Sequence, residues 1–105
     1  MGPDAKEAMP ALMDALKDAV PSVRYISALA LGSIGEEAKD AVPALMELMK
    51  DRVGDVRFAA INALGGIGAE AKLAVPALTQ AANDRSPRIR LAATQALEKI
   101  QQVDM

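Results

Sequence analysis

Apolar and polar residues alternate along this chain with the spacing of amphipathic helices. In the first third, one apolar stripe follows the i, i+3, i+4, i+7 pattern at Met9, Leu12, Met13 and Leu16. A second stripe follows after a short polar link, at Val23, Ser27, Ala30, Leu31 and Ile34. The pattern therefore predicts two helices, the first ending near Asp18 and the second beginning at Val23.

The same pair of stripes returns every 33 residues. The sequence Ala-Val-Pro-Ala-Leu at 41–45 recurs at 74–78 and is anticipated at 8–12. Aligning the sequence with itself at an offset of 33 residues divides the chain into repeats 3–35, 36–68 and 69–101, with a short tail 102–105. A unit of this length cannot bury its apolar face alone, so stacked units share one continuous core. We expect a single all-α domain over 1–105 with six main helices.

Proline, glycine and capping residues predict where the helices begin and end. Pro10, Pro43 and Pro76 are expected at the start of the first helix of each repeat, after a short helical turn. Proline has no backbone N–H to donate, and the first turn of a helix does not need one. The second helices are expected to run from Val23, Val56 and Ile89, with Ser22 and Asp55 as N-caps. Gly35 and Gly68 are expected to end them in a left-handed conformation.

The two ends of the array differ in polarity. The third repeat ends in Leu97-Glu98-Lys99-Ile100-Gln101, where the others have glycine-rich endings, and we interpret this as a polar C-terminal end of a stack. The first helix carries no such substitution, since Met9 and Met13 resemble internal positions. Either this uncapped N-terminal repeat pairs with something, a homodimer being one form, or the chain is the last portion of a longer array.

Composition supports helices and removes several kinds of chemistry. Half of the chain is hydrophobic (51%), but only 2% is aromatic, which favours helices over a sheet. Histidine and cysteine are absent, which excludes disulfides, imidazole or thiolate metal ligands and Ser-His-Asp catalysis. We expect no enzyme activity, no cofactor and no metal.

The charge and hydropathy of the chain predict a water-soluble protein. The formal net charge is −2, which gives no global electrostatic case for nucleic acid or an anionic membrane. No apolar run approaches the roughly 20 residues needed to span a bilayer, and the first residues do not resemble a signal peptide. A cytoplasmic location is the default expectation.

The repeated motifs resemble HEAT repeats, and in particular the short HEAT-like form of phycobilin lyase-type proteins. The resemblance rests on Ala-Val-Pro-Ala-Leu, on Leu-Gly-x-Ile-Gly, on the Asp that closes each first helix and on the Val-Arg that opens two of the second helices. It implies a right-handed α-solenoid, an armadillo-like superhelix of three helix-turn-helix repeats. It also implies a structural ladder formed by Asp18, Asp51 and Asp84 with Arg24, Arg57 and Arg90.

Positions that vary while this framework is held are the candidate binding residues. Tyr25, Phe58 and Leu91 occupy the same slot in successive repeats, and Leu29, Asn62 and Gln95 lie beside them. In a HEAT-like stack the second helices line the concave face, so a row of large apolar groups is expected there. These side chains either form a partner groove, fill gaps between stacked helices while half buried, or make a self-association surface.

The function predicted from this pattern is a non-enzymatic scaffold that binds a protein or peptide along the concave face. The alternative is an accessory subunit or fragment of a bilin-lyase-like or other larger HEAT-repeat protein. A third possibility uses the basic cluster of the third repeat to bind nucleic acid, through Arg85, Arg88, Arg90 and Lys99. The acidic net charge and the lack of aromatic platforms argue against it, so no nucleic-acid partner is expected.

Overall fold

The computed structural model describes residues 5–101, and every regular element among them is helical. The predicted start of the first repeat at Pro3 and the tail 102–105 lie outside these residues. The elements in order are α1 (Ala5–Ala15), α2 (Pro21–Ile34), the 3₁₀ helix η1 (Gly35–Ala41), α3 (Val42–Leu48), α4 (Gly54–Ile67), the 3₁₀ helix η2 (Gly68–Ala74), α5 (Val75–Ala81) and α6 (Pro87–Gln101).

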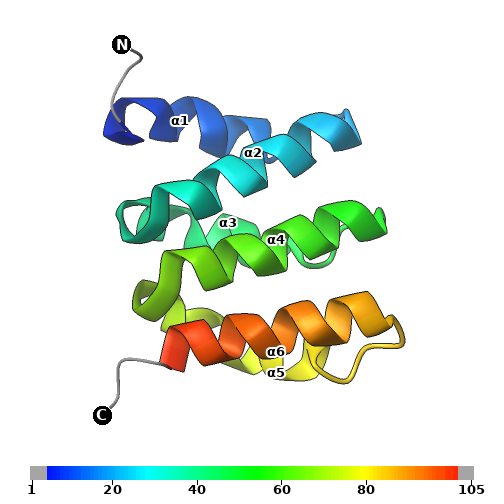
Figure 1. Cartoon of the computed structure of the whole chain (residues 1–105). Helices are drawn as coiled ribbons and strands as arrows, with labels where there is room; N and C mark the ends of the chain where they lie inside the picture. The colour runs from blue at the N-terminus through cyan, green and yellow to red at the C-terminus, as the bar shows by residue number, and fades with distance from the viewer. Residues whose placement is uncertain (1–4, 102–105) are drawn as a thin grey trace.

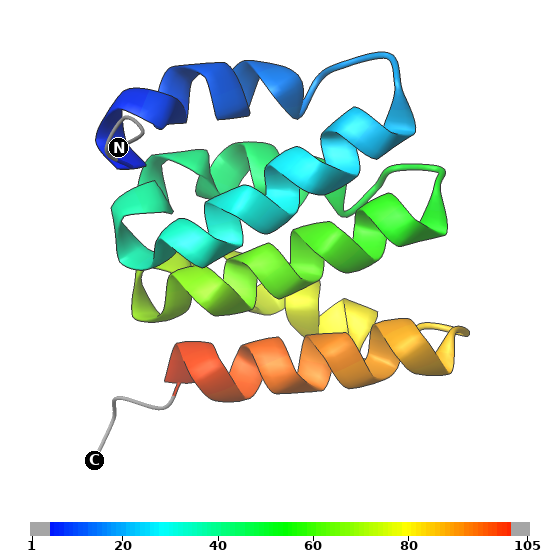
Figure 2. The same ribbon diagram turned by 45° about the horizontal axis from the view of Figure 1, so that its top comes forward.

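The helices form two layers. Helices α2, α4 and α6 lie side by side in one layer, and α1, α3 and α5 lie behind them (Figure 1). A view turned by 45° shows the same succession of helix pairs from the N-terminal to the C-terminal end (Figure 2). The molecule measures 38 × 35 × 20 Å, and the smallest extent is about twice the diameter of one helix. The all-helical repeat prediction is therefore confirmed.

The prediction of six main helices needs correction, because the elements join into four continuous helical stretches. These stretches are 5–15, 21–48, 54–81 and 87–101. Helix α2 continues through η1 into α3, and α4 continues through η2 into α5. The direction changes at Gly35 and Gly68, which have φ of 82° and 78° with ψ near −144° and −142°. This backbone region is open almost only to glycine, so the chain reverses without a loop.

The second helices begin two residues earlier than predicted, and Ser22 and Asp55 are not their N-caps. Helices α2 and α4 start at Pro21 and Gly54, and their N-cap residues Val20 and Val53 make no side-chain capping bond. The Asp18 and Asp51 carboxylates instead accept the Val20 and Val53 N–H groups, each at 2.9 Å. A turn held by aspartate therefore begins the helix, where the sequence suggested an ordinary cap.

The prolines follow the prediction in two repeats of three. Pro43 and Pro76 lie in the first turn of α3 and α5, directly after η1 and η2. Pro10 lies inside α1, because the turn that precedes it is continuous with the helix in the first repeat. The placement of Pro10 at a helix start was therefore wrong.

The core runs through the whole stack and consists mainly of alanine, leucine, isoleucine and valine. Its largest fully buried side chains are Leu31, Leu45, Val56, Ile61, Leu64, Leu78 and Ile100. Glycines let the α2, α4 and α6 backbones approach closely. A Cβ on Gly32 would lie 2.8 Å from Ala63 Cα, and one on Gly65 would lie 3.0 Å from Ala96 Cα. Small residues at these crossings set the spacing between repeats.

One helical stretch, Gly54–Ala81, is long and apolar enough to cross a bilayer by length and composition. The sequence analysis did not single it out, because polar and charged residues interrupt its apolar ones. The stretch reverses direction at Gly68, where φ is positive, and half of its most apolar window is buried inside the protein. Core helices of water-soluble proteins have the same composition, so this feature is weak evidence for a membrane.

Candidate functional site

The exposed face of the α2, α4 and α6 layer carries the predicted row of large apolar side chains. Tyr25 and Phe58 are half-buried and pack against the core, whereas Leu91 is 60% exposed. Leu29 and Asn62 are also half-buried, and Gln95 is exposed. The row thus changes from packed to solvent-exposed toward the C-terminal end.

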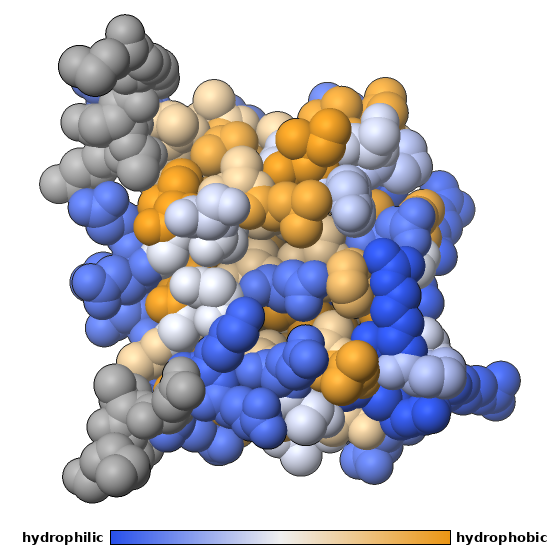
Figure 3. Space-filling view, in the orientation of Figure 1, coloured by the Kyte–Doolittle hydropathy of each residue, from blue (hydrophilic) through white to orange (hydrophobic). Residues whose placement is uncertain are grey.

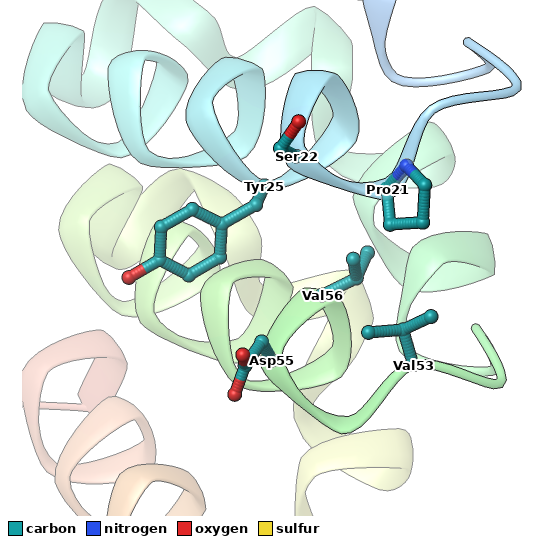
Figure 4. A pocket seen from close by; sticks show the side chains of 6 residues that line it. All are labelled: Pro21, Ser22, Tyr25, Val53, Asp55 and Val56. Carbon is teal, nitrogen blue, oxygen red and sulfur yellow. The ribbon is translucent and has the colours of Figure 1, made fainter.

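A hollow of about 290 Å³ opens beside Tyr25, where the first turns of α2 and α4 meet. Figure 4 shows the Tyr25 ring reaching from α2 across α4, with Val53 and Val56 below Pro21 and Asp55 at the rim. The walls are therefore mostly apolar, and the Tyr25 hydroxyl points away from Pro21, Val53 and Val56 (Figure 4). We call this hollow the Tyr25 pocket.

A second hollow lies further along the line of contact between α2 and α4, which we call the α2–α4 seam; the contact between α4 and α6 is likewise the α4–α6 seam. This second hollow has a volume of about 210 Å³ and is lined by Leu29, Gly32, Ser33, Asn62 and Ala63. The α2–α4 seam thus brings together three predicted residues, Tyr25, Leu29 and Asn62, at two neighbouring hollows. Leu91 and Gln95 lie on α6, away from both.

The equivalent surface beside Phe58 is covered by Arg88. The Arg88 guanidinium carbon lies 3.8 Å from the centroid of the Phe58 ring, a cation–π contact. Its Nη1 also donates to Asp55 Oδ1 at 2.8 Å. Arg88 occupies the slot that holds Asp55 one repeat earlier, and Asp55 is too short to cover Tyr25 in the same way. The α2–α4 seam is therefore open where the α4–α6 seam is closed.

The predicted Asp and Arg residues lie where the links join the helices, and one pair bridges two repeats. Arg24 Nε and Nη2 donate to the two carboxylate oxygens of Asp51, at 2.8 and 3.1 Å. Arg24 Nη1 also donates to the Asp18 and Ala19 carbonyls at 2.7 and 3.1 Å. The six-residue spacing of Asp18 and Arg24 thus corresponds to a bond from Arg24 to the Asp18 backbone, while its carboxylate partner comes from the next repeat.

The corresponding bridge between the second and third repeats is not formed. Arg57 Nη1 donates to the Asp51 carbonyl at 2.8 Å, and Arg90 Nη1 donates to the Asp84 carbonyl at 2.9 Å. Within residues 5–101 no ion pair joins Arg57 to Asp84. The Asp84 carboxylate accepts the Ser86 N–H at 2.9 Å. Each of the three arginines donates to the backbone carbonyl of the Asp six residues before it. Among these six ladder residues, however, only Arg24 and Asp51 form a bond from an arginine to a carboxylate, and we call this pair the rung.

This rung perturbs the ionisation of Asp51. Burial would raise the pKa of Asp51, but hydrogen bonds from Arg24 and from the Val53 N–H, with the charges of Arg24 and Arg52, outweigh burial and lower that pKa below its ordinary value. The side chains of Arg24 and Asp51 are only 14% and 10% exposed. The carboxylate is therefore held ionised as part of the framework.

The described residues show no built site for a metal. Among residues 5–101 there is no group of three or more Asp and Glu side chains placed to hold an ion. In the basic cluster, Arg88 bonds to Asp55, and Arg90 bonds to the Asp84 and Arg85 carbonyls. Two of the four predicted basic residues are thus engaged within the protein.

Comparison with known families agrees with the repeats seen in the fold. A family model described as HEAT repeats matches residues 2–65 and 54–105, which together span nearly the whole chain. The chain belongs to the HEAT repeat family. HEAT repeats commonly mediate protein–protein interaction, and the family is generally a non-enzymatic scaffold. The match does not separate the phycobilin lyase-type form from other HEAT repeats, and no curated protein matches the chain.

Two features of this HEAT repeat protein were missed by sequence reasoning. The pairing of Arg88 with Asp55 and Phe58 was not predicted, because the sequence analysis considered Arg88 only as a member of the basic cluster. The 64% exposure of Ile26 was also missed. A signal for it existed, because Ile26 stands in a slot where the other repeats have Ala59 and Ala92.

Proposed function

We propose that this HEAT repeat protein is a non-enzymatic scaffold that binds a peptide or helix of a partner protein along the α2, α4 and α6 face. Residues 1–105 would act as one domain of repeats 3–35, 36–68 and 69–101. The stack would coil as a right-handed superhelix with this face on its concave side. Binding would need little ordering of the scaffold, because the helices hold successive side chains at fixed spacing.

The observation that supports the proposal is the difference between the two seams. At the α4–α6 seam, the Arg88 guanidinium lies over the Phe58 ring and donates to the Asp55 carboxylate. At the α2–α4 seam, the Tyr25 pocket presents mostly apolar walls to solvent. A pocket that buries one apolar anchor is the usual centre of a protein interface. The open seam is therefore the expected anchor point.

Selection of binders from a random-peptide phage library against the full chain tests the proposal. We expect enriched peptides to lose about tenfold or more in affinity with Tyr25→Ala, as for an anchor worth more than about 1.4 kcal/mol. Leu73→Ala, on an exposed side chain of η2, should leave affinity unchanged.

The same variants separate binding from packing. If Tyr25→Ala and Phe58→Ala both lower the melting temperature strongly while peptide affinity is retained, these rings serve the fold alone. Equal losses of affinity in Tyr25→Ala and Leu73→Ala would also contradict the proposed face.

A further inference from the structure

Six apolar positions on the first repeat are more exposed than their counterparts in the other two repeats. Their counterparts, which are 33 and 66 residues further along the chain, are all buried. In the first repeat, five of the six are half-buried and Ile26 is 64% exposed. We call them the N-terminal end face; they are Ala8, Leu12, Val23, Ile26, Ala30 and Ile34.

The counterparts are buried because a preceding repeat covers them. Ala63 lies against Gly32 of the first repeat, and Ala96 lies against Gly65 of the second. The N-terminal end face is therefore equivalent to the surfaces through which the second and third repeats each pack against the repeat before them. Hydrophobic side chains gather over α1 and α2 at this end, whereas the α6 end is mostly hydrophilic (Figure 3).

The opposite end of the stack cannot serve as the cover. Glu98 of the third repeat stands in the slot of Gly32 and Gly65. In that slot even a single Cβ would come within 2.8 to 3.0 Å of the next repeat's Cα. Head-to-tail stacking of two copies would press the Glu98 carboxylate against an apolar helix without a partner, which is costly. Thr94 and Gln101, also exposed, add further polar groups.

The face also differs from that of a repeat built for the internal stacking mode. Ile26 stands where the second and third repeats bury Ala59 and Ala92, which are 0% and 3% exposed. The Ile26 side chain is larger than the space that a preceding repeat leaves at Ala59 and Ala92. The face is apolar like an internal interface, but its shape requires a different partner.

We propose that the N-terminal end face binds the same face of a second copy of this chain, related by a two-fold axis near Ile26. A two-fold interface needs a self-complementary surface, and the six apolar residues of the face would pack against the same six residues of the second copy. The molecule measures 38 × 35 × 20 Å, so a cross-section through the stack is on the scale of the roughly 800 Å² that each partner contributes to a standard interface. This dimer would leave the Tyr25 pocket on the α2, α4 and α6 face open in both copies.

Light scattering of the full chain over a range of concentrations tests the dimer. We expect the mass of a dimer, and for Ile26→Glu the mass of a monomer, because two carboxylates would meet in the interface. Ile26 is exposed, so this change spares the core. The matched control is Leu73→Glu, since Leu73 is 65% exposed but lies outside the face, and it should remain dimeric. A monomeric wild type at every concentration would overturn the proposal.

Cross-linking gives an independent test because the chain has no cysteine. Under oxidation, Ile26→Cys should form a covalent dimer, and Leu73→Cys should not. Growth into species larger than a dimer would indicate head-to-tail association and contradict the two-fold arrangement. Equal cross-linking of both variants would indicate random collision and would also contradict it.

Discussion

Among single residues, Arg24 shows how one side chain joins two repeats. Its guanidinium donates to the Asp18 and Ala19 carbonyls in the link between α1 and α2. It also donates to both carboxylate oxygens of Asp51 in the next repeat. Arg has the planar set of donors that this arrangement needs, and Lys has not. Because Asp51 also holds the Val53 N–H, the pair fixes both the start of α4 and its position relative to α2.

Replacing Asp51 by Asn should destabilise the protein in a pH-dependent way. The folded-state pKa of Asp51 is lowered from its ordinary value of 3.8, so its ionised form stabilises the fold above that value. This contribution is lost as the pH falls through the folded-state pKa. We expect a loss of about 1–3 kcal/mol in unfolding free energy at neutral pH, shrinking below about pH 4. Urea unfolding followed by circular dichroism across pH measures it.

Asp84→Asn is the matched control for this experiment. Asp84 accepts a backbone N–H in the same turn but has no arginine on its carboxylate within the described residues. The loss at neutral pH should therefore be smaller than for Asp51→Asn. Equal losses in the two variants would show that the turn, and not the arginine bridge, supplies the stability.

The sequence anticipated part of this residue-level arrangement. The resemblance to HEAT repeats named all six ladder residues, and their regular spacing placed them at equivalent points. It could not show that Arg24 finds Asp51 while Arg57 does not bridge to Asp84. Side-chain pairing across a repeat interface depends on local distances, which equivalent sequence positions do not fix.

Among the helical elements, close backbone approach decides how α2, α4 and α6 pack. The crossing of α2 and α4 brings Gly66 against the backbone of Gly32, and a Cβ on Gly66 would lie 2.5 Å from the Gly32 carbonyl oxygen. Backbone atoms on both sides cannot move without shifting a helix. Gly66 is the variable residue of the Leu-Gly-x-Ile-Gly pattern, and the pattern's first glycine, Gly32 or Gly65, lies similarly close to Ala63 or Ala96. The pattern therefore serves packing as well as helix ending.

Gly66→Ala should destabilise the stack although alanine favours helices. The added methyl would force α2 and α4 apart, at a cost of about 1–3 kcal/mol. Gly54→Ala is the matched control, because the nearest atom to its Cβ is the flexible Arg57 Nη2 at 3.6 Å. It should be neutral or stabilising by up to about 1 kcal/mol. Thermal unfolding of both variants would decide, and a stabilised Gly66→Ala would contradict the packing role.

In the molecule as a whole, the three repeats depend on one another. Ile61 and Leu64 of α4 are 1% and 0% exposed, and their counterparts in the third repeat, Thr94 and Leu97, are exposed and half-buried. The second repeat is thus covered on both sides, while the outer repeats are covered on one. Stability should be a sum of repeat and interface contributions.

Deleting the third repeat, with the chain ended at Gly68, should strongly destabilise the remainder. Exposing a buried leucine such as Leu64 alone costs about 1.5–3 kcal/mol, and the α4–α6 interface contains several such side chains. We expect a lower urea midpoint and association of the fragment through α4. Adding Ile61→Thr and Gly65→Glu copies the outer surface of the third repeat onto the second. These changes should suppress the association through α4, but they should neither remove the dimer formed through the N-terminal end face nor restore stability. A fragment as stable as the full chain would refute the dependence.

The repeat length, the helical class, the buried stripes and the glycine turns could all be predicted from the sequence. They follow from local periodicity and backbone conformation, which recur in successive repeats. The sequence did not show which seam is open, which arginine bridges two repeats or which apolar positions lack a covering neighbour. Equivalent positions such as Tyr25 and Phe58, or Ile26 and Ala59, share a place in the repeat but not a place in the stack. Their surroundings depend on the neighbouring repeat, so their roles differ and are fixed only when the repeats pack together.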